Sequence, residues 1–182
     1  MLDIDKDGID DFIVTERTQA PSVVWYKFNG GSWDRFVIDN EPLRIEAGGA
    51  FYDIDGDGNL DIVFAGDAQS NEIWWWENPY PNFDPRKPWV HRTIKKSGSN
   101  KHHDQIFGDF TGDGKTELIS WNQRDDVLWL LEIPKNPKTD IEWKRHVIFK
   151  AENGQGKFEG LAKADVDMDG KQDIIGAGRW FK

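Results

Sequence analysis

The sequence predicts an all-β protein built from repeated four-stranded units, and three observations support this class. An acidic motif of nine residues occurs four times, with starts that are 50, 56 and 56 residues apart. Each copy is followed by a short apolar run rich in β-branched or aromatic residues. No segment shows the periodicity of an amphipathic helix, so we expect almost no helix.

The repeat length narrows this class to one architecture. Four short strands in about 50 residues is the size of a β-propeller blade. We therefore predict a single domain over residues 1–182, a partial β-propeller of about 3.5 antiparallel blades with approximate units 1–46, 47–102, 103–158 and 159–182. The first unit lacks its inner strand, which is the strand that leads into the acidic motif. The last unit is expected to end after the strand that follows the acidic motif. We expect the remaining blades to come from a missing segment or from a partner chain.

Within a unit, the predicted strands follow one another in a fixed order. The first is the apolar run after the acidic motif, as at residues 62–64, and the second carries tryptophan, as at 73–76. A third has Trp and Ile five residues apart, as in Trp89 and Ile94, and a fourth leads into the next acidic motif, as at 105–108. Tryptophans that recur in this register indicate packing between blades.

The composition excludes several classes of protein and partner. The chain has 23 basic and 33 acidic residues and a formal net charge of −10, which argues against a nucleic-acid partner. Aromatic residues make up 13%, which argues against disorder, and the absence of cysteine excludes disulfides. No apolar run approaches the length of a membrane helix, so we expect no membrane insertion. No signal peptide is recognised, and because the first motif begins at residue 3 we expect a truncated start.

The acidic motif, D-x-D-x-D-G-x-x-D, has the composition of a metal-binding loop. Carboxylates at positions 1, 3, 5 and 9 converge only if the backbone curls, which Gly at position 6 permits, and position 7 offers a carbonyl. Such hard oxygen ligands suit Ca²⁺. The copies are loop one (residues 3–11), loop two (53–61), loop three (109–117) and loop four (165–173). The predicted calcium ligands are Asp3, Asp5, Asp7, Ile9, Asp11, Asp53, Asp55, Asp57, Asn59, Asp61, Asp109, Thr111, Asp113, Lys115, Glu117, Asp165, Asp167, Asp169, Lys171 and Asp173.

Two other structures could explain the acidic motif. An EF-hand requires Glu at position 12, where these loops have Val14, Phe64, Ser120 and Gly176. An ordinary acidic turn is the other alternative, because Asp-Gly is common in hairpins, but four copies in one register favour metal binding. Loop three departs most from the pattern, with Thr111 and Glu117 in place of aspartate.

The acidic loop followed by an apolar strand resembles the FG-GAP/VCBS repeat of calcium-binding β-propellers, over essentially the whole chain. Such repeats occur in integrin heads, in adhesins and in propeller enzymes that act on sugars. Residues 73–79 are more similar to the secreted bacterial and fungal members, some of which resemble sugar dehydratases and uronate-cleaving lyases. The resemblance implies a secreted carbohydrate-active protein, a polysaccharide lyase or sugar dehydratase. The alternative is a non-catalytic calcium-stabilised binding or adhesion module.

The expected calcium affinity of the loops indicates where in or outside the cell the protein acts. Loop sites of this type often bind Ca²⁺ with dissociation constants of roughly 10⁻⁴–10⁻³ M, the range of extracellular modules. We therefore expect a secreted or periplasmic protein. Its expected partner is a uronate-containing carbohydrate or a protein ligand.

Candidate catalytic residues lie where the units differ, at the strand ends opposite the acidic loops. Equivalent positions before the inner strand hold His103 and Glu159, and the end of the adjoining strand holds Arg179. The predicted catalytic residues are His102, His103, Glu159 and Arg179, with a histidine as general base. The predicted substrate-binding residues are Arg44, Arg124, Trp121 and Trp180, the arginines for a uronate carboxylate and the tryptophans for a sugar ring.

These assignments have a simple alternative, because His102 and His103 follow a polar segment and fit an ordinary loop. If His103, Glu159 and Arg179 cluster in a pocket, the enzyme is favoured. Dispersed positions favour the binding module.

Overall fold

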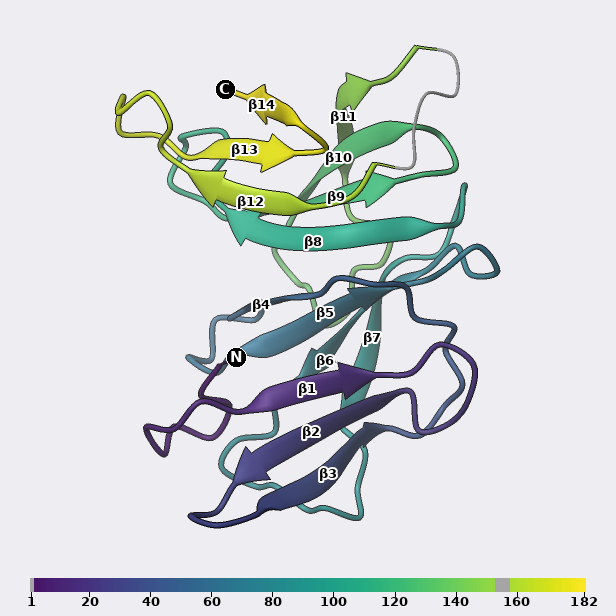
Figure 1. The fold of residues 1–182 in the computed structure, drawn as a ribbon, viewed down its shortest axis with the longest axis vertical. Coiled ribbons are helices and arrows are strands. Elements are labelled where there is room, and N and C mark those ends of the chain that lie inside the picture. Colours follow the sequence, from purple (N-terminus) through teal and green to yellow (C-terminus); the bar gives the residue numbers. More distant parts are fainter. Residues whose placement is uncertain (1, 153–157) are drawn as a thin grey trace.

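The computed structural model describes residues 2–152 and 158–182. Within these residues the chain forms fourteen β-strands and no helix, in four antiparallel sheets (Figure 1). The predicted all-β class is therefore confirmed, and the sheets are consistent with partial propeller blades. The described residues contain no helix long and apolar enough to span a membrane.

Each sheet is formed by consecutive strands. Sheet one contains β1 (Phe12–Thr15), β2 (Val23–Phe28) and β3 (Trp33–Asp39). Sheet two contains β4 (Ala50–Tyr52), β5 (Asp61–Ala65), β6 (Ile73–Glu77) and β7 (Val90–Lys95). Sheet three contains β8 (His102–Gly108), β9 (Glu117–Asn122), β10 (Val127–Glu132) and β11 (Arg145–Lys150). Sheet four contains β12 (Leu161–Ala164), β13 (Asp173–Gly176) and β14 (Arg179–Phe181).

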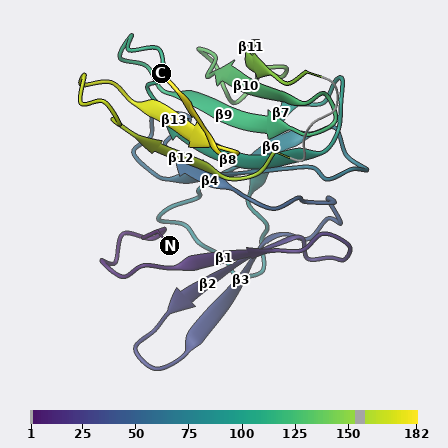
Figure 2. The ribbon, with the colours of Figure 1, turned by 45° about the horizontal axis from the view of Figure 1, so that its top comes forward.

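The sheets follow one another along the molecule in chain order. The inner strand β8 contacts both β4 and β12, so the inner strands of sheets two, three and four are neighbours. In the views of Figures 1 and 2, sheet one lies at the end of the molecule away from sheet four. The acidic loops join β4 to β5, β8 to β9 and β12 to β13, and loop one precedes β1. All four loops therefore lie at the same end of their strands.

Sheet four contains one strand more than the sequence predicted. The expectation that the last unit ends after its second strand, β13, was wrong. A third strand, β14, pairs with β13 and places Arg179 opposite Gly176 and Phe181 opposite Ile174. The connection is a two-residue turn of Ala177 (φ 50°) and Gly178 (φ 70°). Left-handed conformations at both central residues are typical of the type I′ hairpin turn, which matches the twist of the strands.

Tryptophan side chains fill the space between neighbouring sheets. Trp25, Trp74 and Trp76 belong to the cluster between sheets one and two, and Trp75 and Trp129 belong to that between sheets two and three. Trp74, Trp75 and Trp76 are each at most 1% exposed although they are consecutive. Since neighbouring side chains on a strand point to opposite faces, β6 supplies both clusters at once.

Candidate metal centres and the opposite end

All four acidic loops are folded by the same hydrogen bonds. The N–H of the glycine at position 6 donates to the carboxylate at position 1 in each loop. The pairs are Gly8 to Asp3 (3.0 Å), Gly58 to Asp53 (2.9 Å), Gly114 to Asp109 (2.9 Å) and Gly170 to Asp165 (2.9 Å). This bond closes the loop around the first carboxylate.

The carboxylate at position 9 is anchored in the same way in every loop. It accepts a hydrogen bond from the N–H of position 2. The pairs are Ile4 to Asp11 (3.2 Å), Ile54 to Asp61 (3.0 Å), Phe110 to Glu117 (2.9 Å) and Val166 to Asp173 (2.8 Å). All four anchored carboxylates belong to buried residues, whereas positions 5 are exposed.

Two positions of each loop take the left-handed backbone conformation. The sequence indicated this for the glycine at position 6, whose φ lies between 82° and 86° in the four loops. Position 4 is also left-handed, and it is occupied by Lys6 (59°), Gly56 (77°), Gly112 (73°) and Met168 (61°). Glycine in loops two and three was a sequence signal for this second turn, which the lysine and methionine of the other loops hide.

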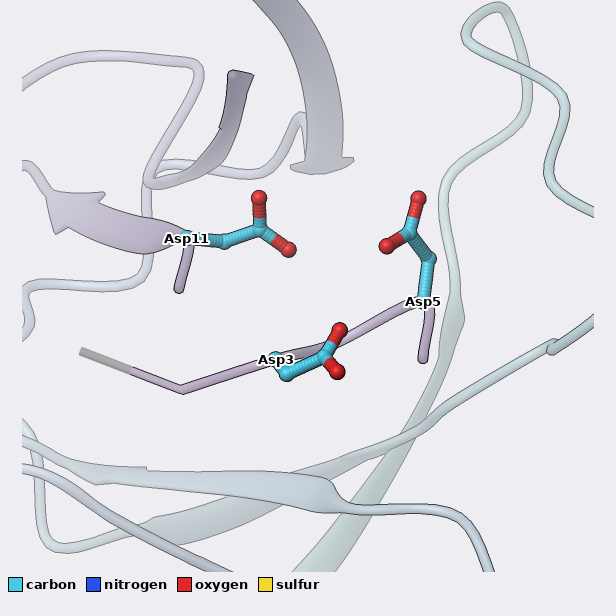
Figure 3. A group of neighbouring side chains, drawn as sticks. All are labelled: Asp3, Asp5 and Asp11. Atoms are coloured by element: carbon cyan, nitrogen blue, oxygen red, sulfur yellow. The ribbon is translucent and has the colours of Figure 1, made fainter. Parts of the chain in front are cut away.

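The carboxylates of each loop converge on a small space. In every loop, three of them offer oxygen atoms that all lie within 4.8 Å of one another. Figure 3 shows this for loop one, where the side chains of Asp3, Asp5 and Asp11 point toward a common space. The other groups are Asp53, Asp55 and Asp57, then Asp109, Asp113 and Glu117, and finally Asp165, Asp167 and Asp173.

Loops one and two contain buried carboxylate oxygens that lack a hydrogen-bond partner among the described residues. Among the described residues, Asp5 Oδ1, Asp11 Oδ1 and Asp53 Oδ1 have no hydrogen-bond partner. A buried carboxylate oxygen without a partner destabilises a fold by a few kcal/mol, roughly 1–3. A cation at the point of convergence of loop one would satisfy the oxygens of Asp5 and Asp11, and a second cation in loop two would satisfy that of Asp53. The donor set, carboxylates only and no nitrogen or sulfur, fits Ca²⁺.

The electrostatics of loop two support the same assignment. Burial, and to a smaller extent the nearby carboxylates of Asp55 and Asp57, raise the pKa of Asp61 to about 7 although two backbone hydrogen bonds lower it. Burial likewise raises the pKa of Asp11 in loop one. Clustered carboxylates that are partly buried repel one another, and a bound cation removes that repulsion.

Lysine ammonium groups lie against carboxylates of all four loops, and in loop three the lysine is Lys115 of the loop itself, 2.8 Å from Asp113 Oδ2. Lys27 Nζ is 2.7 Å from Asp7 Oδ2 and also pairs with Asp5. Lys138 Nζ is 2.7 Å from Asp55 Oδ2, and Lys182 Nζ is 3.1 Å from Asp169 Oδ2. The hydrogen bonds that these ammonium groups donate to carboxylates raise the pKa of Lys27, Lys138 and Lys182 above the usual value. These ammonium groups balance part of the loops' negative charge.

Loop three differs from the others at its ninth position. The Thr111 hydroxyl donates to Glu117 Oε1 (3.1 Å), and the Phe110 N–H donates to Glu117 Oε2. Both oxygens of this carboxylate therefore have partners within the loop. Both oxygens of Asp61 in loop two are engaged as well, by two backbone N–H groups, so loop three is set apart by Thr111 in place of an aspartate.

At the opposite end of the strands, the structure brings His103 and Glu159 together. His103 Nε2 lies 3.6 Å from Glu159 Oε1, and His103 Nδ1 lies 2.8 Å from Asp104 Oδ2. The Gly160 N–H also donates to Asp104 Oδ2 (2.7 Å). Since a carboxylate only accepts, His103 Nδ1 carries the proton and its Nε2 is free to accept one.

Asp104 owes its place in this group to an irregularity of β8. The register of β8 against β9 shifts between His103 and Gln105, and Asp104 has a left-handed φ of 47°. Such bulges redirect side chains and are frequent next to functional sites. Burial raises the pKa of Asp104, but the hydrogen bonds from His103 and Gly160 outweigh it and hold the pKa below its usual value.

The other predicted polar residues do not join His103. The Arg179 guanidinium lies 5.0 Å and 5.1 Å from the ring centres of Phe149 and Phe158, and it donates to the Ala177 carbonyl. Arg44 pairs with Asp67 at 2.7 Å, and Arg124 donates to Asn100. Trp180 is half exposed on β14. Within the described ranges, no ion pair links these arginines to Glu159.

Two predicted site residues lie in the interior instead. His102 is fully buried and contacts Lys95 Nζ and Asn122 Nδ2 at 3.3 Å each, because it precedes His103 on one strand and points to the other face. Burial lowers the pKa of His102 to about 3. Trp121 is also fully buried, with its ring stacked on Phe158. Neither side chain is accessible to a ligand.

Residues that sequence reasoning left out of the site are Asp104 and Gln123. Gln123 Nε2 donates to the Phe158 carbonyl (2.8 Å) and lies 3.4 Å from Glu159 Oε1. Position in the repeat was the available signal, because Gln123 directly follows β9 at the end of sheet three where β8 begins. A groove of about 710 Å³ lies beside loop three, between Asp113 and His146, and does not include His103.

Comparison with known proteins agrees with the repeat. Residues 53–120 match a family described as an FG-GAP-like repeat. This span runs from loop two through sheet two and loop three into β9, and over it the resemblance to FG-GAP-type repeats is confirmed. No curated protein matches the chain.

Proposed function

Since residues 53–120 match FG-GAP-like repeats, we propose that the chain is a calcium-binding segment of a β-propeller in which each acidic loop holds one Ca²⁺. One observation carries the proposal. Converging carboxylates in loops one and two have buried oxygens on Asp5, Asp11 and Asp53 that lack partners among the described residues. Loops three and four repeat the same backbone fold.

The role of the protein's own residues follows from the loop geometry. The carboxylates at positions 1, 3, 5 and 9 would hold the ion, and the backbone bonds at positions 2 and 6 keep them converged. Bound Ca²⁺ supplies positive charge where the inner strand of a sheet meets the next strand. A ligand that binds only the folded loop stabilises it by about 2.7 kcal/mol at a concentration of 100 times Kd.

Isothermal titration with Ca²⁺ tests the proposal directly. We expect binding to several sites per chain, with dissociation constants of roughly 10⁻⁴–10⁻³ M, as in extracellular modules. That range would also support a secreted or periplasmic location. Asp5→Asn should remove one site, whereas Asp10→Asn in the same loop should not, because Asp10 is outside the carboxylate group. No heat of binding, or an equal loss in both variants, would exclude the metal sites.

A second function, proton transfer on a uronate-containing carbohydrate, is favoured by the group around His103. The Asp104 carboxylate fixes the His103 tautomer, so Nε2 is available as a general base for the α-proton of a uronate. Glu159, more than half exposed, lies beside it and as a carboxylic acid can donate a proton to the leaving oxygen when the bond between carbon and that oxygen breaks. A lyase or dehydratase requires these roles.

Activity on uronate polysaccharides, measured by the ultraviolet absorbance of the unsaturated product, tests this second function. His103→Gln should abolish turnover and leave the calcium-dependent melting temperature unchanged. His146→Gln is the matched control, because His146 pairs with Glu132 in sheet three, away from Asp104 and Glu159. Turnover that survives His103→Gln would leave the non-catalytic module as the function.

A further inference from the structure

One buried amide side chain joins loop one to loop two. Asn78 directly follows β6 and is 2% exposed. Its Nδ2 donates to the carbonyl of Ile4 in loop one (3.1 Å) and to the carbonyl of Leu60 in loop two (3.1 Å). A single amide group therefore holds the backbones of two candidate metal centres that belong to different repeat units.

Both ends of this link reach a carboxylate at position 9 of a loop. In loop two, the Asn78 N–H donates to Asp61 Oδ1 (2.9 Å). In loop one, the Ile4 N–H donates to Asp11 Oδ2 (3.2 Å), and the Ile4 carbonyl belongs to the peptide bond that leads into Asp5, one of the converging side chains of Figure 3. Ile4, Asp11 and Asp61 are each 1% exposed, so the hydrogen bonds between the loops are shielded from water.

Loops two and three lack this amide link. The position in sheet three that is equivalent to Asn78 is Ile133, since each stands two residues after the partner of the first residue beyond the loop. An isoleucine side chain forms no hydrogen bond, and Ile133 packs against the apolar cluster of sheets two and three. Sheet three instead reaches loop two through the ion pair of Lys138 with Asp55, which involves no carboxylate of loop three.

Building on the calcium function proposed above, we propose that Asn78 couples loops one and two, so that Ca²⁺ in either loop raises the Ca²⁺ affinity of the other. Without an ion, the converging carboxylates repel one another and favour an open loop. An ion in loop two holds Asp61, and through Asn78 it holds the Ile4 peptide in place. Loop one then loses less conformational freedom when its own ion binds, and the effect is reciprocal. Asn78 is thus a positioning residue, because it acts on the loop backbones.

Isothermal titration with Ca²⁺ measures this coupling in a chain whose loops three and four are disabled. Asp113→Asn and Asp167→Asn each remove one carboxylate of the respective group and give this background. The product of its two binding constants is divided by the product of the constants obtained with loop two disabled by Asp57→Asn and with loop one disabled by Asp5→Asn. We expect this coupling ratio to be about five or more, the lower end of common coupling between sites.

The variant Asn78→Ser breaks the link and keeps the local turn. The Tyr80 N–H donates to Asn78 Oδ1 (3.0 Å), and serine accepts in turns of the same kind, but its shorter side chain cannot bridge the two carbonyls. The coupling ratio should fall to about one, which is the value for independent sites. Asn82→Ser, an exposed residue of the same connection, is the matched control and should leave the ratio unchanged. A purely structural role for Asn78 would weaken both sites and leave the ratio as it was.

Amide hydrogen exchange gives a second measurement that needs no change at residue 78. In the background with Asp5→Asn, Ca²⁺ in loop two should slow exchange of the Ile4 N–H, which donates to Asp11. A titration without heat of binding would overturn the calcium function itself. Ca²⁺ binding with a coupling ratio of about one, a ratio that survives Asn78→Ser, or Ile4 exchange that does not respond to Ca²⁺ would overturn the coupling and leave the calcium sites in place.

Discussion

The two ends of the strands in this molecule differ in how far they repeat. At the loop end, the same two backbone-to-carboxylate hydrogen bonds occur in all four units, at 2.8–3.2 Å. At the opposite end, sheets one and two bring Arg17 to Glu46 and Arg44 to Asp67, whereas sheets three and four bring His103 to Glu159. A feature that every unit retains serves the fold, and one that differs between units is free to serve a local function.

Removal of metal should have the largest effect, and it should act through the loop end alone. Each site saturated at 100 times Kd contributes about 2.7 kcal/mol, and for a chain of this size that corresponds to about 5–10 °C in Tm. We expect EGTA to lower Tm by at least this amount and Ca²⁺ to restore it, measured by circular dichroism with Mg²⁺ as a control. An unchanged Tm would remove the functional distinction between the two ends.

Substitutions in two loops sharpen the comparison within the loop end. Asp57→Ala in loop two should reduce Ca²⁺-dependent stability by about 2–3 kcal/mol, because it removes one of three converging carboxylates. Thr111→Ala in loop three should cost only about 1 kcal/mol, since it removes one hydrogen bond to Glu117. Chemical denaturation with and without Ca²⁺ measures both. A larger effect of Thr111→Ala would show that loop three is the stronger site.

Acid should destabilise the protein through His102, which is buried near the strand ends opposite the acidic loops. The pKa of buried His102 is lowered to about 3, against about 6.5 in the unfolded chain. Below pH 6.5 the unfolded state therefore binds more protons, so stability is complete above that pH and falls toward pH 3. We expect a slope of up to about 1.4 kcal/mol per pH unit from this residue.

Denaturation in EGTA over this pH range isolates the contribution of His102. The variant His102→Gln should lose part of the slope, whereas exposed His146→Gln should retain it. The positive charges of Lys95 and Arg145 oppose protonation of His102, so neither residue is substituted in these variants. An identical slope in wild type and His102→Gln would mean that other groups govern acid sensitivity.

The smallest expected effect concerns the lysines at the loop end. Lys138→Met should raise the Ca²⁺ affinity of loop two by about two- to fivefold, because the ammonium group beside Asp55 competes with the ion and half-exposed ion pairs contribute at most about 1 kcal/mol. Lys135→Met, an exposed lysine of the same connection, is the control. Lower affinity in Lys138→Met would mean that the lysine orders the loop instead of opposing the ion.

Repetition explains what could be predicted from the sequence. Four copies of one motif fixed the strand class and the loop fold, since every copy carries the same information. Which side chains of a single strand face outward is not repeated information, because it depends on the pairing of that strand alone. Whether His102 or His103 faces outward depends on where β8 begins to pair, and the left-handed position held by Asp104 is occupied by glycine in sheets two and four, Gly48 (φ 87°) and Gly160 (φ 80°). Lys138 reaches loop two from 83 residues away along the chain, and no local pattern signals that contact.

The turn before β14 was missed for a related reason. Ala177 is an uncommon residue for a left-handed position, so the Ala177-Gly178 pair did not signal a hairpin as Asn-Gly would have. Trp121 was assigned to a ligand surface because it lies near the strand end opposite the acidic loops, beside His103 in the pairing of β8 and β9. Its side chain lies on the face of β9 that packs against sheet four.

The serial contact of the inner strands, with β8 between β4 and β12, has a consequence for how the protein loses its structure. A molecule whose units contact their neighbours in a row behaves like a one-dimensional chain of coupled elements. Sheets two and three are supported on both sides, while sheets one and four are supported on one side only. Opening should therefore begin at the terminal sheets and move inward, and amide protons of β9 should exchange most slowly of all.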